Sequence, residues 1–167
     1  KPNLTALPFP RIPYDEAMLK YGSDKPDLRN PLVITDVTAV FSRGDVEFRA
    51  FRNIIEQGGV VRAIRAPGAG GKTRSFFDKL GDWAKEIGAP GLGYIKFEEY
   101  PVGDVLPGAL ASVASGPFVK FLSVDPLNEL IKLTDLKHGD AVFFVCDKPD
   151  KAAKMAGQAR TRIAQDM

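Results

Sequence analysis

Apolar positions along the chain recur with two different spacings, which distinguish strands from helices. Short runs rich in apolar and β-branched residues cover residues 60–66, 92–98 and 141–146. The last run, AVFFVC, is continuously apolar, and such a run is typical of a strand buried on both faces. We therefore expect residues 141–146 to form the central strand of a sheet.

Apolar residues at helical spacing predict helices around these strands. They indicate helices over residues 14–21, 36–41, 47–57, 75–87, 117–122, 125–133 and 149–166. In the clearest of them, Ser75 and Asp78 match a capping box. Its apolar stripe consists of Phe76, Phe77, Leu80, Trp83, Ala84 and Ile87. The last helix should bury Ala152, Met155, Ala156, Ala159 and Ile163.

The order of these elements defines the expected fold class. Strand, helix, strand, a long connection, helix, strand and helix follow one another, which predicts an α+β fold. We expect a two-layer sandwich whose mainly antiparallel or mixed sheet carries helices on one face. Residues 1–31 contain an extended and helical lead-in, and residues 32–167 form the domain. The Gly- and Pro-rich connection at residues 100–116 is expected to be a mobile loop.

The lead-in ends in a distinctive loop, YGSDKPDLRNP at residues 21–31. Gly22 can supply the positive φ that ends a helix, while Pro26 and Pro31 disfavour helix at the residues before them. The loop is either a self-neutralised solvated turn or a functional element. Four charges of alternating sign lie in it: Asp24, Lys25, Asp27 and Arg29.

Composition limits the possible classes of protein. The 167 residues are 44% hydrophobic and 26% charged, enough for one core without disulfides or metal. The single cysteine, Cys146, lies in the apolar run and fits a reduced, cytoplasmic compartment. No stretch has the roughly 18 apolar residues of a membrane span. The chain begins at Lys1 without Met, so we expect an excised fragment.

Positive charge is concentrated in one region. The net charge is only +2, but residues 43–74 hold seven basic and three acidic residues. This region is either a weak anion-binding surface or an ordinary solvated one. The basic residues considered as contacts are Arg62, Arg65, Lys72 and Arg74.

A phosphate-binding loop is the main alternative. APGAGGKT at residues 66–73 fits the relaxed pattern and lies between a predicted strand and a predicted helix. However, Arg62 and Arg65 fall on opposite faces of that strand, whereas the strand before a phosphate loop is buried on both faces. Burying two unpaired guanidinium groups would cost several kcal/mol each. The interpretation as a small nucleotide-binding protein is therefore kept only as an alternative.

Several strings in order resemble one family. FPRIPYDEAMLKYG at residues 9–22, the loop itself and LVITDV at residues 32–37 resemble the segment by which bacterial-type aspartyl-tRNA synthetases leave their class II catalytic core. Later strings resemble the insertion domain of these enzymes, which is shared with an archaeal tRNA-dependent amidotransferase subunit. They are GGVVRAIRAPG (58–68), GLGYIKF (91–97), GPFVKFL (116–122) and GDAVFFVCD (139–147).

The resemblance implies a parent enzyme larger than this chain. Such a parent joins aspartate to ATP with Mg²⁺ and transfers the aspartyl group to tRNA, and it is expected to be a homodimer. The class II catalytic motifs do not occur here, so we expect no catalytic residue, cofactor site or metal site in this fragment. The fragment alone is expected to be inactive and monomeric.

The resemblance also suggests a role for the charged residues. Asp24, Lys25 and Arg29 would lie beside the active-site entrance, in a hinge-like loop with little apolar area holding it to the domain. The domain would border the acceptor end of tRNA, and the alternative is a structural spacer without RNA contact. The predicted phosphate contacts are Lys25, Arg29, Arg62, Arg65, Lys72 and Arg74.

Overall fold

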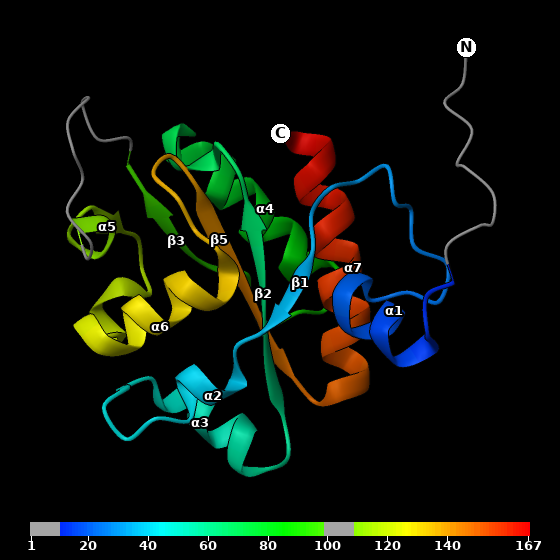
Figure 1. The fold of residues 1–167 in the computed structure, drawn as a ribbon, viewed down its shortest axis with the longest axis horizontal. Coiled ribbons are helices and arrows are strands. Elements are labelled where there is room, and N and C mark those ends of the chain that lie inside the picture. The colour runs from blue at the N-terminus through cyan, green and yellow to red at the C-terminus, as the bar shows by residue number, and fades with distance from the viewer. Residues whose placement is uncertain (1–10, 99–108) are drawn as a thin grey trace.

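A five-stranded antiparallel sheet forms the centre of the computed structural model, which describes residues 11–98 and 109–167 (Figure 1). The strand order is β1-β2-β5-β3-β4 and every pairing is antiparallel. The strands are β1 (Ile34–Asp36), β2 (Val60–Ala66), β3 (Gly93–Phe97), β4 (Ala114–Ser115) and β5 (Ala141–Asp147).

Helices of very different lengths connect these strands. Among the described residues the longest helix is α7 (Pro149–Asp166), which follows β5. The others are α1 (Tyr14–Tyr21), α2 (Thr38–Phe41), α3 (Arg49–Glu56), α4 (Arg74–Glu86), α5 (Ala109–Ser112) and α6 (Val124–Thr134), with 3₁₀ turns η1 (Ala69–Gly71) and η2 (Val119–Phe121). None of the described helices is long and apolar enough to cross a membrane.

Strand β5 is the central strand, as its apolar run predicts. It pairs with β2 through residues 141–147 and with β3 through residues 141–144. Cys146 is 6% exposed, and burial raises the pKa of its thiol to about 12. Cys146 is therefore a core residue, as expected.

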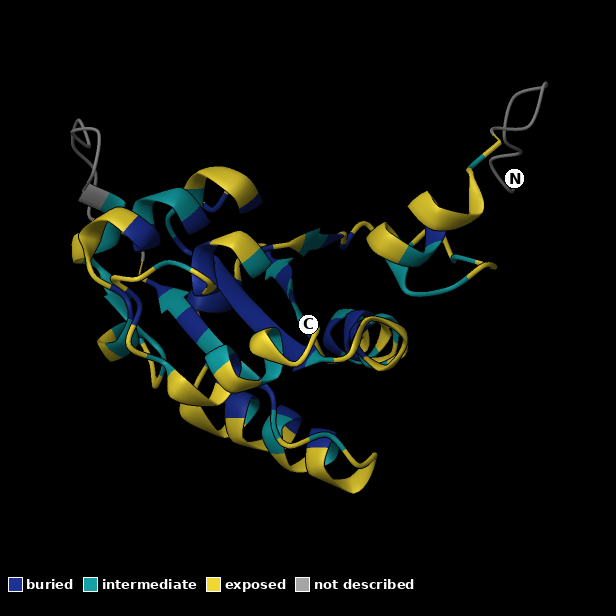
Figure 2. Cartoon of the chain, turned by 90° about the horizontal axis from the view of Figure 1, so that it is seen from below, coloured by how far each residue is buried: buried dark blue, intermediate teal, exposed yellow. Residues whose placement is uncertain are grey.

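The α+β class and the antiparallel sheet are confirmed, but helices cover both faces of the sheet. Helices α4 and α7 pack on one face, with Phe77 and Ile163 in that core. Helices α2, α3 and α6 pack on the other, with Phe41 and Leu130. The result is three layers rather than two, because alternate residues of β5 are apolar on both faces and each face needs cover. Figure 2 shows the dark blue central strand between helices whose outer sides are exposed.

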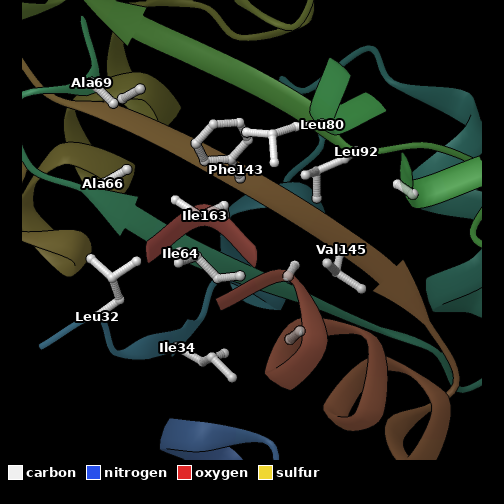
Figure 3. Packing of buried hydrophobic residues seen from close by; sticks show 14 of the residues in the cluster. Leu32, Ile34, Ile64, Ala66, Ala69, Leu80, Leu92, Phe143, Val145 and Ile163 are labelled. Atoms are coloured by element: carbon white, nitrogen blue, oxygen red, sulfur yellow. The ribbon is translucent and has the colours of Figure 1, made fainter. Parts of the chain in front are cut away.

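The core on the α7 side joins distant parts of the chain (Figure 3). Leu32 and Ile34, at the start of the domain, pack in the same cluster as Ile163, close to the end of the chain. This cluster connects β1 to α7 and so defines where the lead-in enters the fold. Its labelled members also include Ile64, Ala66, Ala69, Leu80, Leu92, Phe143 and Val145.

Three local predictions differ from the structure. Strands β1 and β4 were not predicted, because three and two residues are too short to show a period. The predicted capping box at Ser75 does not form, since α4 already begins at Arg74 after Thr73, without a side-chain cap. Trp83 is only partly buried. Most of the predicted loop at residues 100–116 lies outside the described residues, and its end forms α5 and β4.

Candidate functional site

The loop at residues 22–31 begins where α1 ends against α7. Gly22 has φ 67° and its amide bonds the carbonyl of Met18, so it closes α1 as predicted. A Cβ on Gly22 would lie 2.6 Å from the amide nitrogen of Gly157 in α7. The two helices therefore meet backbone to backbone, and Ala17 of α1 is buried there. The expectation that little holds the lead-in to the domain is wrong, because glycine packing needs no large apolar side chain.

The charged side chains of this loop are exposed. Arg29 donates from Nε and Nη2 to Asp27 at 2.9 and 2.8 Å, and its own side chain is 92% exposed. This side-chain hydrogen bond from Arg29 is the main reason that the pKa of Asp27 falls to about 2. Asp24 and Lys25 are also exposed. The loop can therefore present Lys25 and Arg29 to an anion in solvent.

Arg160 of α7 holds this loop, and sequence reasoning missed it. Its guanidinium donates to the carbonyl oxygens of Asp27, Asn30 and Leu32, although Arg160 is only 3% exposed. The signal was present, because Arg160 follows Ala156 by four residues and so falls on the buried stripe of α7. A charged residue at such a position indicates a specific partner.

Arg62 and Arg65 are already paired inside the domain. Arg62 faces Asp36 across the β1–β2 pair, with Nη1 2.5 Å from Oδ2, an ion pair without hydrogen-bond alignment. Arg65 Nε donates to Asp140 at 2.7 Å and Nη1 to Asp135 at 2.9 Å. Both guanidinium groups therefore neutralise carboxylates of the fold. A phosphate would have to compete with these pairs for either arginine.

Asp140 organises the turn beside Arg65, and it was predicted only as a turn residue. It is 4% exposed, and besides Arg65 its carboxylate accepts from the amides of Gly68 and Lys137 at 3.1 and 2.9 Å. Its side chain therefore ties the segment after β2 to the turn before β5. No apolar period marks such a residue, so its burial could not be read from the pattern.

Lys72 and Arg74 lie at the start of α4 and are more accessible. Lys72 Nζ is 5.7 Å from the centre of the Phe76 ring and 3.4 Å from the carbonyl oxygen of Met167. The Arg74 side chain is 89% exposed, with Nε 3.6 Å from Asp78. Weak pairs of this kind leave both cations available to a stronger anionic partner.

Helix α7 relates the two groups of cations. Arg160 holds the loop that carries Lys25 and Arg29, and Met167, seven residues later, contacts Lys72. Seven residues make about two helical turns, so these two contact points lie roughly 10 Å apart along the axis of α7. We call Lys25, Arg29, Lys72 and Arg74 the α7 cations.

The segment at residues 66–73 is filled by protein atoms. The amide of Gly70 donates to the carbonyl of Gly139 at 2.7 Å, and a Cβ on Gly70 would lie 2.8 Å from the carbonyl oxygen of Asp140. Strand β2, which precedes it, is antiparallel to both of its neighbours. These features describe a structural turn, and they do not favour the phosphate-loop alternative. Among the described residues no cluster of His, Cys, Asp and Glu could hold a metal ion.

Comparison with known proteins places the chain in a family. Residues 51–156 match the GAD domain, and the chain belongs to this family. It is 63% identical over 159 residues to an aspartate–tRNA(Asp/Asn) ligase of Methylocella silvestris and 59% identical over 162 residues to one of Beijerinckia indica. It is also 51% identical over 164 residues to one of Rickettsia bellii.

These matches cover most of this chain but only a small part of each relative. They cover 95%, 95% and 98% of this chain but 24%, 25% and 25% of the three ligases. The chain thus spans about a quarter of the length of the curated relatives it matches. The resemblance to bacterial-type aspartyl-tRNA synthetases is confirmed, and the match to the GAD domain lies within residues 32–167.

Proposed function

We propose that this chain is the GAD-domain segment of an aspartate–tRNA ligase. The observation that carries this is the match of 95% of the chain, at 63% identity, to about a quarter of such a ligase. The parent would activate aspartate with ATP and Mg²⁺ outside this segment, transfer it to tRNA, and act as a cytoplasmic homodimer. The segment itself would be a non-catalytic accessory domain.

We further propose that the α7 cations face the acceptor end of the tRNA. Phosphate contacts position an RNA without reading its sequence, and lysine and arginine exposed on one side of a domain can supply them. The support is the exposure of Arg29 and Arg74 and the weak partners of Lys72. Arg62 and Arg65, candidates from the sequence, would instead maintain the fold through their internal ion pairs.

Alanine replacement of the four α7 cations in the full-length ligase tests this role. We expect a raised Michaelis constant for tRNA and unchanged adenylate formation, because the cations would touch only the RNA. The control removes four exposed cations from other parts of the domain, Arg49, Lys85, Lys120 and Lys132. Equal effects of the two quadruple variants would contradict a specific contact and favour the structural-spacer alternative.

The nucleotide-binding alternative has a separate test. ATP binding by the 167-residue chain, abolished by Lys72→Ala, would support it. We expect no such binding, because Gly70 uses its amide within the turn. Isothermal titration of the chain with Mg²⁺ and ATP measures this directly.

A further inference from the structure

One buried guanidinium group binds the loop at residues 22–31 at three points. Arg160 Nε donates to the Leu32 carbonyl oxygen at 2.5 Å. Its Nη2 donates to the carbonyl oxygens of Asn30 at 2.6 Å and Asp27 at 3.0 Å. The guanidinium carbon also lies 5.0 Å from the centre of the Tyr21 ring, at the end of α1. Arg160 thus reaches from the beginning of the loop to its end.

The loop and α7 also bond in the opposite direction. The Asn30 side-chain amide donates to the Arg160 carbonyl oxygen at 3.2 Å, while its Oδ1 accepts from the Leu32 amide at 3.0 Å. One turn earlier in α7, a Cβ on Gly157 would lie 2.8 Å from the Gly22 carbonyl oxygen. The entry and the exit of the loop are therefore both fixed to residues 157–160.

The chemistry of Arg160 suits this task. A buried charge is tolerated only when its donors are satisfied, and the partners here are backbone carbonyl oxygens. Burial lowers the pKa of Arg160, an effect that Tyr21 and Asp27 oppose. A planar guanidinium can reach three oxygens that surround it, whereas the single ammonium of a lysine cannot span them in the same way. Removal of the guanidinium would take this donor away from the buried Leu32 carbonyl and from the partly buried Asn30 and Asp27 carbonyls, which favours exposure of these groups to water.

We propose that Arg160 is a positioning residue that fixes the loop at residues 22–31 on α7 and thereby holds Lys25 and Arg29 in one place. The lead-in from α1 and the GAD domain then move as one rigid unit. The loop is not a hinge, and the joint with the rest of the proposed ligase does not lie within residues 22–31. We call the set of hydrogen bonds between Arg160 and the loop the clamp. The RNA-directed part of this inference rests on the proposed function, but the clamp itself does not.

Hydrogen exchange on the 167-residue chain tests the clamp without any catalytic readout. Arg160→Met should raise the exchange rate of the loop amides, including that of Asn30, and of the adjacent Leu32 amide by about tenfold or more. Arg160→Lys should give a smaller rise. Arg52→Met is the matched control, because Arg52 Nη2 donates to the carbonyl oxygens of Arg43 and Val46 and so has the same chemistry at a different loop.

A second variant separates the clamp from general stability. Asn30→Ala keeps Arg160 but removes the bonds from Asn30 to α7 and to the Leu32 amide, and it should raise exchange in the same loop. Loop exchange unchanged in Arg160→Met would overturn the proposal. It would also be overturned if both variants increased exchange equally across the loop, α7 and the sheet, since Arg160 would then stabilise the whole fold rather than the loop.

Kinetics of the full-length ligase test whether the clamp positions Lys25 and Arg29 for tRNA. Arg160→Met should raise the Michaelis constant for tRNA several-fold and leave adenylate formation unchanged, with partial recovery in Arg160→Lys and no effect of Arg52→Met. When Lys25→Ala and Arg29→Ala are already present, Arg160→Met should raise the Michaelis constant for tRNA little further, because all three changes would remove the same contact surface. Full additivity would overturn the positioning role. One outcome would separate the two proposals. If Arg160→Met released the loop but the Lys25 and Arg29 changes left the Michaelis constant for tRNA unchanged, the proposed RNA contact would be refuted and the clamp would still be supported.

Discussion

Gly22 and Gly157 touch backbone to backbone, and this contact joins the lead-in to the last helix. A Cβ on Gly157 would lie 2.8 Å from the carbonyl oxygen of Gly22 and 3.1 Å from the carbonyl oxygen of Tyr21. Neither position can carry a larger side chain without moving α1 away from α7. Figure 1 shows α1 beside the middle of α7, far from the centre of the sheet. Two glycines separated by 135 residues thus determine how the lead-in docks.

Gly157→Ala should release α1 although it improves the intrinsic helix propensity of α7. Alanine is favoured over glycine inside a helix by about 1 kcal/mol, but its Cβ would strike the Gly22 carbonyl. We expect faster tryptic cleavage after Lys20 and Arg29 with little loss of the domain core. Limited proteolysis followed by mass spectrometry measures this.

Gly81→Ala is the control for this substitution. Gly81 lies within α4, and a Cβ there would meet no atom within 4 Å. This change should therefore raise the free energy of unfolding by about 0.5–1 kcal/mol without altering cleavage of the lead-in. If Gly157→Ala behaved in the same way as Gly81→Ala, the proposed contact between α1 and α7 would be refuted.

Strands β2, β3 and β5 could be predicted from sequence because their signal is local. The continuous run at β5 identified the central strand, and the stripe of Ala152, Ala156, Ala159 and Ile163 gave the correct buried face of α7. The predicted number of layers, two instead of three, was wrong, because a buried strand does not reveal which helices cover which face of the sheet. That choice depends on the order of strands in the sheet, and pattern alone does not fix it.

The site was harder to predict because its determinants are pairings between distant residues. In the sequence Arg62 and Arg65 look like the other basic residues, Lys72 and Arg74. In the fold, however, Arg62 pairs with Asp36 and Arg65 with Asp140. The loop at residues 22–31 was identified as an ordered turn, but its anchor, Arg160, lies at least 128 positions further along the chain. Neither composition nor period contains such information.

Trp83→Ala should destabilise less than its ring size suggests. The side chain is only partly buried, and Arg162 lies 5.8 Å from the ring centre. We expect a loss of about 1–3 kcal/mol, whereas Phe77→Ala, which empties a nearly fully buried site on the same helix, should cost about 3–5 kcal/mol. Denaturant unfolding followed by circular dichroism compares the two. A larger loss for Trp83→Ala would show that its ring is buried in solution.

The thiol of Cys146 should react slowly in the folded chain. Burial raises its pKa to about 12 from an ordinary value of 9.0, so at pH 8 the thiolate fraction is reduced. We expect alkylation by iodoacetamide at least about a hundredfold slower than in denaturant. Because the unfolded thiol loses its proton first, this group lowers the free energy of unfolding as pH rises from about 9 to 12. Alkylation at the unfolded rate would contradict the burial.

Asp140→Ala should destabilise the turn between α6 and β5 more than a change at Asp135, the exposed carboxylate that also pairs with Arg65. Asp140 is 4% exposed and accepts hydrogen bonds from Arg65 and from two backbone amides, so its loss removes three partly buried hydrogen bonds at once. Removal of an acceptor that leaves its donors without a partner costs about 1–3 kcal/mol. Asp135→Asn is the matched control, because Asp135 bonds the same Arg65 from a position where its side chain is 76% exposed. Asparagine also tolerates the φ of 50° at this position, so the change should cost about 1 kcal/mol or less. Urea unfolding of the two variants measures the difference, and similar midpoints would mean that Arg65, rather than Asp140, holds the turn.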